Sequence, residues 1–462
     1  MRTGGGKLNA MAIGNDRKYR MDMCHGPLFS QIVRFSLPLF MSQMIQLLFN
    51  AADLIVVGRY AEHEAMAAVG STASVTFLLI NVFFGLSIGT NVMAANFYGA
   101  KDDVNLSRTT HTAILIALLG GFLSGEIGFG LSRTLLRMMS SPENVIGKAT
   151  LYMRIYFMGM PFLLLYNFGS SILRALGDTK RPLIFLAIAG VINVVLNMYF
   201  VICLHWDVAG VASATVISQG VSCVLVLRAL MMADEDCRLQ LRKLRIHGTI
   251  LKKMMGIGLP AAVQASCFSL ANVIIQASVN SFGSLAMAGN AAAVSLEGMV
   301  YVGSFTYHQT AISFAGQNLG GHEYGRIKRS CWYCLALTTA ICILMGYGGY
   351  IFGQQLLGIY NPDPEVIIWG MRRLKVLFTT YFLCGTMDTV SGAMRGLGHS
   401  LMSAISNLAG VCLLRIVWIY TYFQMNRTME CLMMTYPLSW GVTTIVNGFV
   451  LWYFMRKLTY NA

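Results

Sequence analysis

The sequence contains a nearly unbroken series of long apolar stretches, and this series restricts the chain to few kinds of fold. About 20 apolar residues in an α-helix cross the hydrocarbon core of a bilayer. Segments in lipid must pair their backbone groups internally, which favours helices over open strands. The sequence therefore predicts an all-α membrane protein with twelve transmembrane helices. Their approximate bounds are 30–58, 67–97, 109–136, 150–173, 182–204, 208–232, 251–279, 286–316, 331–358, 368–394, 401–423 and 432–455.

The composition excludes a soluble multidomain protein. Of the 462 residues, 56% are hydrophobic and only 12% are charged, whereas soluble chains carry about 25% charged residues. A net charge of +14 on a soluble protein would suggest nucleic-acid binding. Here the basic residues lie between the apolar stretches, so we interpret them as a topology signal and expect no nucleic-acid partner. The eleven cysteines are scattered and are interpreted as small apolar residues.

The distribution of Lys and Arg predicts the orientation in the membrane. Of the 34 Lys and Arg residues, 24 lie on the side of the even-numbered connections and the two termini, in the connections or towards the adjoining ends of the stretches. The opposite side holds 9, and Arg415 lies inside a stretch. By the positive-inside rule, both termini are expected in the cytoplasm. Residues 1–28 are polar and are interpreted as a cytoplasmic tail. We expect a plasma (inner) membrane location, contact with the lipid bilayer and a monomer.

An internal repeat divides the chain into two halves. We expect six-helix lobes at 29–233 and 251–457, joined by a cytoplasmic linker at 234–250. Each half contains an even number of helices, so both enter the membrane from the same side and their symmetry axis follows the membrane normal. A substrate is expected in the cleft between the lobes. The matching residues are Leu37-Pro38 with Leu259-Pro260 and Asn50 with Asn272, 222 positions apart, and Arg174–Gly177 with Arg395–Gly398, 221 apart.

Four carboxylates fall within the stretches: Asp53, Glu126, Glu297 and Asp388. Placing such a group at the centre of a membrane costs about 2.5–3.5 kcal/mol on insertion scales and commonly marks an ion or substrate path. Asp53 has the most polar surroundings, because Gln46 and Asn50 share its helical face. Helix–helix hydrogen bonding would explain the amides but requires no carboxylate. We therefore interpret Asp53 as functional, whereas Glu126 lies near the outer end of its stretch.

Polar residues in other stretches leave two interpretations open. Asn193 and Asn197 lie one turn apart and can share a face, either for function or for interhelical bonding. In the second half, Glu297 and Asp388 either form a buried ion pair with Arg415 or contribute to a second cation or substrate site.

Three prolines fall inside predicted helices, where a proline removes a backbone hydrogen bond and bends the helix. Pro38 and Pro260 occupy equivalent first helices, and Pro161 interrupts the fourth. Pro38 is a candidate hinge, because a bend there could move Asp53, fifteen residues later. Permanent structural kinks are the alternative.

Signatures of enzymes are absent from the sequence. No Walker A motif is present, so we do not expect ATP to drive the protein directly. Gly85-Leu-Ser87-Ile-Gly89 fits GxSxG but lies within an apolar helix instead of a strand–turn–helix elbow. We therefore expect a transporter without a cofactor.

Several segments in order resemble the MATE family of multidrug and toxic compound extrusion transporters. They are 49–59 (FNAADLIVVGR), 96–100 (NFYGA), 173–179 (LRALGDT), 210–219 (GVASATVISQ) and 316–320 (GQNLG). The resemblance covers about residues 30 to 457, and the prokaryotic branch is the most similar. It implies two lobes around a central cleft that opens alternately to each side, and export driven by entry of Na⁺ or H⁺.

The resemblance also implies roles for individual residues. The cation-binding carboxylate of the family's first helix corresponds to Asp53, which would be a metal ligand only if Na⁺ is the coupling ion. The helix-five pair corresponds to Asn193 and Asn197. Prokaryotic relatives commonly carry Asp at the second of these positions, so Asn197 is a departure that leaves Asp53 as the obvious titratable group of the first lobe.

We therefore predict a cation-coupled antiporter that exports amphipathic, cationic organic compounds. Cation coupling is assigned to Asp53 with Asn50, Asn193 and Asn197. A flippase for a lipid-linked oligosaccharide is the alternative, and a non-transporting receptor or scaffold is a more distant one. The residues expected in the substrate cleft are Gln46, Asn167, Asn272, Gln276, Glu297 and Asp388.

Overall fold

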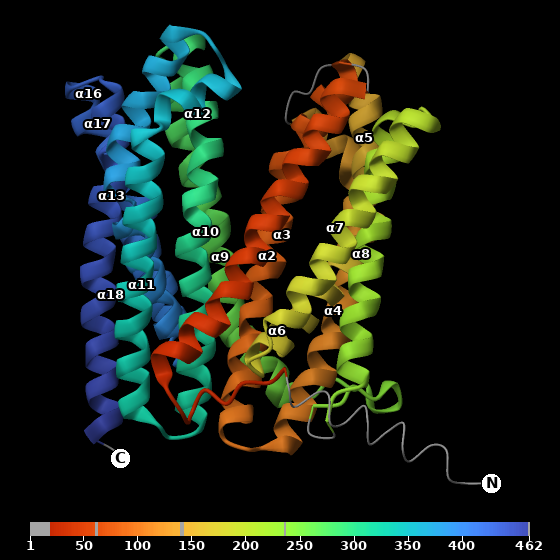
Figure 1. Ribbon diagram of the computed structural model, residues 1–462, viewed down its shortest axis with the longest axis vertical. Coiled ribbons are helices and arrows are strands. Elements are labelled where there is room, and N and C mark those ends of the chain that lie inside the picture. The colour runs from red at the N-terminus through yellow and green to blue at the C-terminus, as the bar shows by residue number, and fades with distance from the viewer. Residues whose placement is uncertain (1–18, 61–62, 139–142, 235–236, 461–462) are drawn as a thin grey trace. The chain divides into compact units, whose positions relative to one another are not determined.

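The structure is a computed structural model that describes residues 19–60, 63–138, 143–234 and 237–460. Within these ranges the chain forms helices and no β-strand. The first half, coloured red to yellow-green in Figure 1, contains helices and two short irregular helical turns. Their bounds are α2 (Leu28–Tyr60), α3 (His63–Gly99), α4 (Asp103–Met138), α5 (Glu143–Met158), α6 (Met160–Ala175), α7 (Lys180–Met198), the π-helix η1 (Tyr199–Cys203), α8 (Asp207–Met231) and the 3₁₀-helix η2 (Leu241–Lys243).

The second half contains longer helices followed by several short ones. The helix α13 packs against α10, α11 and α18, and Figure 1 shows these helices running along one another. The bounds are α9 (Gly248–Asn280), α10 (Ser284–Gly320), α11 (Tyr324–Ile351), α12 (Gly353–Tyr360), α13 (Pro364–Gly396), α14 (Ser400–Asn407), the π-helix η3 (Leu408–Leu413), α15 (Leu414–Tyr420), α16 (Tyr422–Met425), α17 (Met429–Met433) and α18 (Thr435–Tyr460).

All twelve predicted stretches fall on these helical segments, and the predicted all-α membrane class is confirmed. Among the described residues, ten helical segments are long and apolar enough to cross a membrane, and the bent pair α5–α6 makes an eleventh. The tenth predicted stretch, 368–394, falls on α13, which is 33 residues long. It carries Arg372, Arg373 and Lys375 and is not among those segments. Many large apolar side chains are exposed, including Leu344 at 74%, as expected for helices that face lipid.

The bend predicted at Pro161 is present. The segments Val145–Met158 and Met160–Ala175 meet at 46°, with Pro161 in the first turn of α6. A Cβ atom at Gly121 would lie 2.5 Å from the Cα atom of Pro161, so only glycine permits this close approach of α4 to the bend. Pro38 and Pro260 instead lie inside the continuous helices α2 and α9.

The two halves repeat the same turn at equivalent positions. Gly177 and Gly398, which are 221 positions apart, have φ angles of +85° and +84°. Their backbone nitrogens donate to the carbonyl oxygens of Arg174 and Arg395, both at 2.9 Å. A left-handed glycine that satisfies the last carbonyls of a helix is a common helix end. The repeated Arg-x-Leu-Gly motif therefore encodes the same end of α6 and α13.

The chain contains two compact units, and two of the three boundaries between them fall inside helices. The first unit contains residues 1–22 and 37–255, and the second contains residues 23–36 and 256–462. The two boundaries inside helices lie shortly before Pro38 in α2 and Pro260 in α9. These bounds differ from the lobes expected at 29–233 and 251–457, because the beginning of α2 packs within the second unit and the beginning of α9 within the first.

Candidate functional site

In the first unit, Asp53 lies at the start of a chain of polar side chains. Asn197 on α7 donates a hydrogen bond from Nδ2 to Oδ1 of Asp53 on α2, at 2.5 Å. The same nitrogen lies 3.3 Å from Oδ1 of Asn193, one turn earlier on α7. Asn193 in turn contacts Oγ1 of Thr215 on α8 at 3.4 Å. The structure thus brings together three of the four residues predicted for cation coupling and adds Thr215.

This group is shielded from water and has one acceptor unused. Asn193 and Asn197 are buried, whereas Asp53 is half-buried. Oδ1 of Asn197 is also buried and has no hydrogen-bond partner in the described part of the chain. A carboxylate and an amide oxygen are ligands that hard cations prefer. The arrangement can therefore bind a proton on Asp53 or hold a small cation next to it.

The remaining polar residues predicted in the first unit are not joined to this group. Asn50 and Gln46 are exposed on α2, and no hydrogen bond connects either side chain to Asp53 among the described residues. Asn167 on α6 donates to the carbonyl oxygen of Leu163 in its own helix, at 3.0 Å. Their assignment to coupling or to a substrate cleft stays a prediction.

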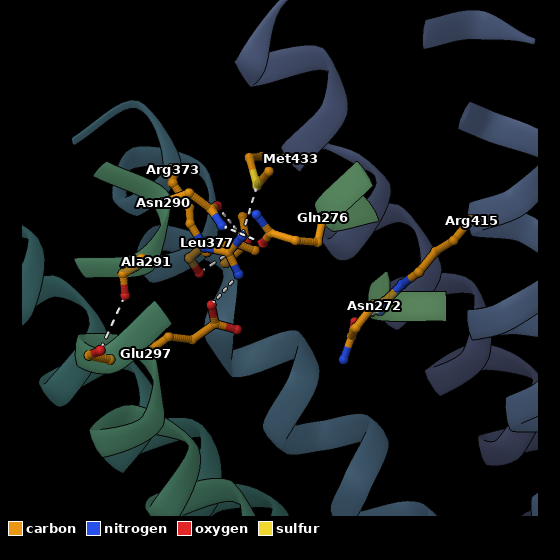
Figure 2. Close-up of polar contacts among 11 residues, drawn as sticks. Asn272, Gln276, Asn290, Ala291, Glu297, Arg373, Leu377, Arg415 and Met433 are labelled. Carbon is orange, nitrogen blue, oxygen red and sulfur yellow. Dashed lines mark hydrogen bonds and ion pairs between the residues drawn. The ribbon is translucent and has the colours of Figure 1, made fainter. Parts of the chain in front are cut away.

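In the second unit, Glu297 forms a buried ion pair, but its partner differs from the expected one. Oε2 of Glu297 on α10 lies 2.5 Å from Nη2 of Arg373 on α13, with side-chain exposures of 15% and 5%. Figure 2 shows Arg373 between Glu297 and Asn290, and shows Arg415 apart from this group beside Asn272. The expected pairing of Glu297 with Arg415 is therefore corrected to a pairing with Arg373.

Amide side chains extend this ion pair to α9. Nη1 of Arg373 donates to Oδ1 of Asn290 at 2.8 Å, and Nδ2 of Asn290 donates to Oε1 of Gln276 at 2.9 Å. Gln276 then donates to Asn280 on its own helix at 2.9 Å. Gln276, one of the residues expected in the substrate cleft, is thus part of a network that joins α9, α10 and α13, and two of its members, Gln276 and Asn280, are exposed.

Arg415 on α15 is buried among polar and aromatic groups. Its Nε donates to Oγ of Ser439 at 3.1 Å, and its Nη1 donates to Oδ1 of the exposed residue Asn272 at 3.4 Å. The guanidinium carbon lies 4.2 Å from the centre of the Tyr436 ring, within the range of a cation–π interaction.

Asp388 belongs to a separate polar network on the same helix as Arg373. Its Oδ2 accepts a hydrogen bond from Ser304 at 2.8 Å, and its backbone oxygen lies 2.7 Å from Nδ1 of His308. The other ring nitrogen of His308 lies 3.3 Å from Nη1 of Arg395. Asp388 and Glu297 therefore have different partners and do not form one site with Arg415.

Sequence reasoning missed Arg373 and Asn290, which complete the network around Glu297. Arg373 lies beside two other basic residues at the start of the predicted stretch 368–394, so the sequence indicates a group of charges next to a connection instead of a buried partner. Helical spacing offers a signal that could have identified it: Arg373 and Leu377, both buried, are one turn apart, whereas the neighbouring Arg372 is 44% exposed in its side chain.

Comparisons with known proteins agree with this architecture. A model of the MatE family matches residues 38–199 and 260–421, the same repeat offset of 222 positions. The probable multidrug resistance protein YpnP of Bacillus subtilis (strain 168) is 28% identical over 401 residues, covering 85% of this chain and 88% of that protein. A FAD transporter of Shewanella oneidensis is 23% identical over 408 residues, covering 86% and 89%.

A solved structure has the same fold. It is the outward-facing conformation of a multidrug resistance MATE family transporter of the MOP superfamily, with a TM-score of 0.88 at 21% identity, covering 95% of this chain and 98% of that chain. The fold and the matches define a multi-pass helical membrane transporter for small molecules, and not an enzyme. The two matched segments together span more than half of the sequence. The chain belongs to the MatE family.

Proposed function

We propose that the protein is a cation-coupled antiporter that exports amphipathic, cationic organic molecules. The observation that carries this proposal is the contact between Asp53 on α2 and Asn197 on α7. A carboxylate in a membrane-spanning helix is expensive unless it has a function or a partner. Here its described hydrogen-bond partner is a neutral amide, so its charge remains available to a cation.

Binding of a proton or Na⁺ would change the interaction between two helices. An ionised Asp53 accepts a charge-assisted hydrogen bond from Asn197, about twice as strong as a neutral one. Neutralisation of Asp53 weakens this bond and shifts the conformational equilibrium, in which Pro38 is the proposed hinge of α2. Transport is coupled when the cation and the organic substrate favour different conformations or compete for one site. For Na⁺, the free oxygen of Asn197 would add a ligand.

Relatives support the choice of cargo. The YpnP protein carries the name probable multidrug resistance protein. Because another relative carries the name FAD transporter, FAD should also be tested as a cargo. Drug-like organic compounds remain the first choice.

The proposal includes a plasma-membrane location with both termini in the cytoplasm and a monomeric state. The exposed residue Cys203 lies at the end of the fifth span and would then lie on the outer side. A membrane-impermeant maleimide should label Cys203 in intact cells, and labelling that requires broken cells would contradict this orientation. Light scattering of the purified protein in detergent checks the monomer.

Efflux from proteoliposomes tests the coupling. Wild-type protein is reconstituted with a cationic dye, and the Na⁺ and pH gradients are imposed separately to identify the coupling ion. The variant Asp53→Asn should lose gradient-driven efflux and still bind the dye, because the amide keeps the shape of the side chain but cannot be protonated and lacks the negative charge that attracts Na⁺. Glu126→Gln is the matched control, since Glu126 is an exposed carboxylate of the same unit. Unchanged gradient-driven efflux by Asp53→Asn would contradict the proposal.

A further inference from the structure

Arg415 is a buried positive charge without a carboxylate partner in the described part of the chain. It is 4% exposed, and its neighbours are Ser439, Asn272 and the ring of Tyr436. Hydroxyl, amide and aromatic groups solvate a guanidinium but do not neutralise it. Burial of a charge that has no opposite charge is strongly unfavourable. The guanidinium of Arg415 is therefore suited to bind a negatively charged group from another molecule.

The charges of the surrounding helices leave this requirement unmet. Two carboxylates and three arginines are buried or half-buried in α10, α13 and α15. Glu297 is bound to Arg373. Asp388 interacts electrostatically with Arg395. Arg415 is the remaining positive charge of this set. Its electrostatic interaction with Glu297 is weak, because Glu297 is already in an ion pair with Arg373.

The internal repeat shows which residues of the first half correspond to this position. At the repeat offset of 222, Arg415 corresponds to Asn193, and Asn272 corresponds to Asn50. The π-helix η3, directly before α15, accounts for the change from an offset of 221 at Gly398, because a π-turn accommodates one additional residue. The pairing of Arg415 with Asn272 thus stands where the first half has its candidate cation site.

The equivalent positions differ in the sign of their charge. The counterparts of Asp53 and Asn197 are Ile275 and Ile419, both buried in the apolar core of the second unit. The second half therefore has an apolar residue at the position of the acid and an arginine at the position of Asn193. The first repeat therefore has a candidate site for a positively charged group, and the second repeat has, at the equivalent position, a candidate site for a negatively charged group.

We propose that Arg415 and Asn272 form a binding site for one oxyanion, a carboxylate or phosphate group, of the transported molecule. This inference rests on the proposed export function and specifies its substrate class: amphipathic compounds with a cationic centre that also carry an acidic group, which makes them zwitterions. The planar guanidinium binds carboxylates and phosphates through paired hydrogen bonds. Its Nη2 donates no hydrogen bond to a described residue, and the 3.4 Å contact of Nη1 with Asn272 is long enough to be exchanged for an oxyanion.

A matched pair of dyes tests the proposal by direct binding to the purified protein in detergent. Rhodamine 110 carries a free carboxylate, and rhodamine 123 is its methyl ester. Fluorescence polarisation should show tighter binding of rhodamine 110 to the wild type. The variant Arg415→Met should weaken binding of rhodamine 110 by about 10- to 100-fold, as expected for a lost hydrogen-bonded charge pair, and binding of the ester by less than about twofold on the same scale.

Two further variants separate charge from structure. Arg415→Lys keeps the charge without the planar fork and should retain part of the preference for rhodamine 110. Arg427→Met removes an exposed arginine of the same unit and should affect neither dye. Equal losses for both dyes in Arg415→Met, or wild-type protein that binds the ester more tightly, would overturn the proposal. The wild-type comparison stands even if the variant does not fold.

A membrane lipid could supply the same oxyanion, and a second arm distinguishes it from cargo. Phosphatidylglycerol is added to the dye-binding assay, with phosphatidylcholine as the neutral control. Absence of displacement supports binding of cargo, whereas displacement by phosphatidylglycerol alone would assign the site to lipid and overturn the proposal. The assay requires no ion gradient, so its outcome is independent of whether Asp53 couples transport to a cation.

Discussion

The ion pair between Glu297 and Arg373 should act as a single unit in stability measurements. Replacing Glu297 by Met leaves the guanidinium of Arg373 charged and 5% exposed in its side chain, with only amide, thioether and aromatic neighbours. Breaking a buried pair by removing one partner costs about 3–5 kcal/mol. We expect a loss of this size in the free energy of unfolding for Glu297→Met. The loss for Arg373→Met should be smaller, because a carboxyl group can be neutralised by a proton whereas a guanidinium remains charged.

The double variant Glu297→Met/Arg373→Met provides the decisive comparison. Two apolar side chains of similar length replace the pair, and such replacements are often neutral or stabilising. Denaturant titration of the purified proteins in mixed micelles gives the four corners of a double-mutant cycle. The coupling energy should be at least about 2 kcal/mol, and the double variant should be more stable than Glu297→Met alone.

A neighbouring arginine offers a control with opposite expectations. Arg372 lies 3.8 Å from Glu430, and both side chains are 44% exposed. Exposed pairs of this kind contribute about 0–1 kcal/mol, so Glu430→Gln should change the free energy of unfolding by a small amount only. Additive losses in the Glu297–Arg373 cycle, or a larger effect at Glu430, would refute the reasoning from burial.

Two further predictions concern turns. Gly177→Ala and Gly398→Ala should each lower the free energy of unfolding by about 1–2 kcal/mol, because alanine strains a left-handed backbone. Gly177→Ala should cost more, because a Cβ atom at Gly177 would lie 2.6 Å from Met21, whereas one at Gly398 meets no neighbour. Denaturant titration measures both losses, and equal losses would contradict this expectation. Burial, and then the charge of Lys457, lower the pKa of His399. Wild type should therefore lose thermal stability as the pH falls below about 6.5, and His399→Gln should lose less; identical pH profiles would disprove the coupling.

The arrangement of helices was accessible from the sequence because lipid imposes simple rules. Apolar length predicted the helical segments, although α13 is not apolar enough to be counted among the candidate membrane spans, and repeated residues such as the Arg-x-Leu-Gly motifs predicted the two halves. A proline inside an apolar stretch predicted the bend at Pro161, where α5 and α6 meet at 46°. Each of these signals is local in the chain, or recurs at one constant offset. Both kinds can be read from a single sequence.

Partners of polar groups were harder to predict because they come from different helices. Spacing placed Asn193 and Asn197 on one face, but it could not show that Asn197 contacts Asp53, 144 positions earlier. Of the two interpretations left open for Glu297, the ion pair with Arg415 was wrong. Its partner is Arg373, which lies beside two other basic residues and therefore resembled part of a loop. Such contacts depend on how two helices are rotated relative to each other. This rotation cannot be inferred from the sequence of either helix alone.

The division of α2 and α9 between the two units has a consequence for the integrity of the chain. The first nine residues of α2, Leu28–Ser36, belong to the second unit, and the first eight residues of α9, Gly248–Met255, belong to the first. The start of the first helix of each half of the sequence thus belongs to the compact unit formed mainly by the other half. A polypeptide severed between α8 and α9 would yield two fragments, neither of which holds all of its own packing partners, so co-synthesis of both would be required to recover a complete fold.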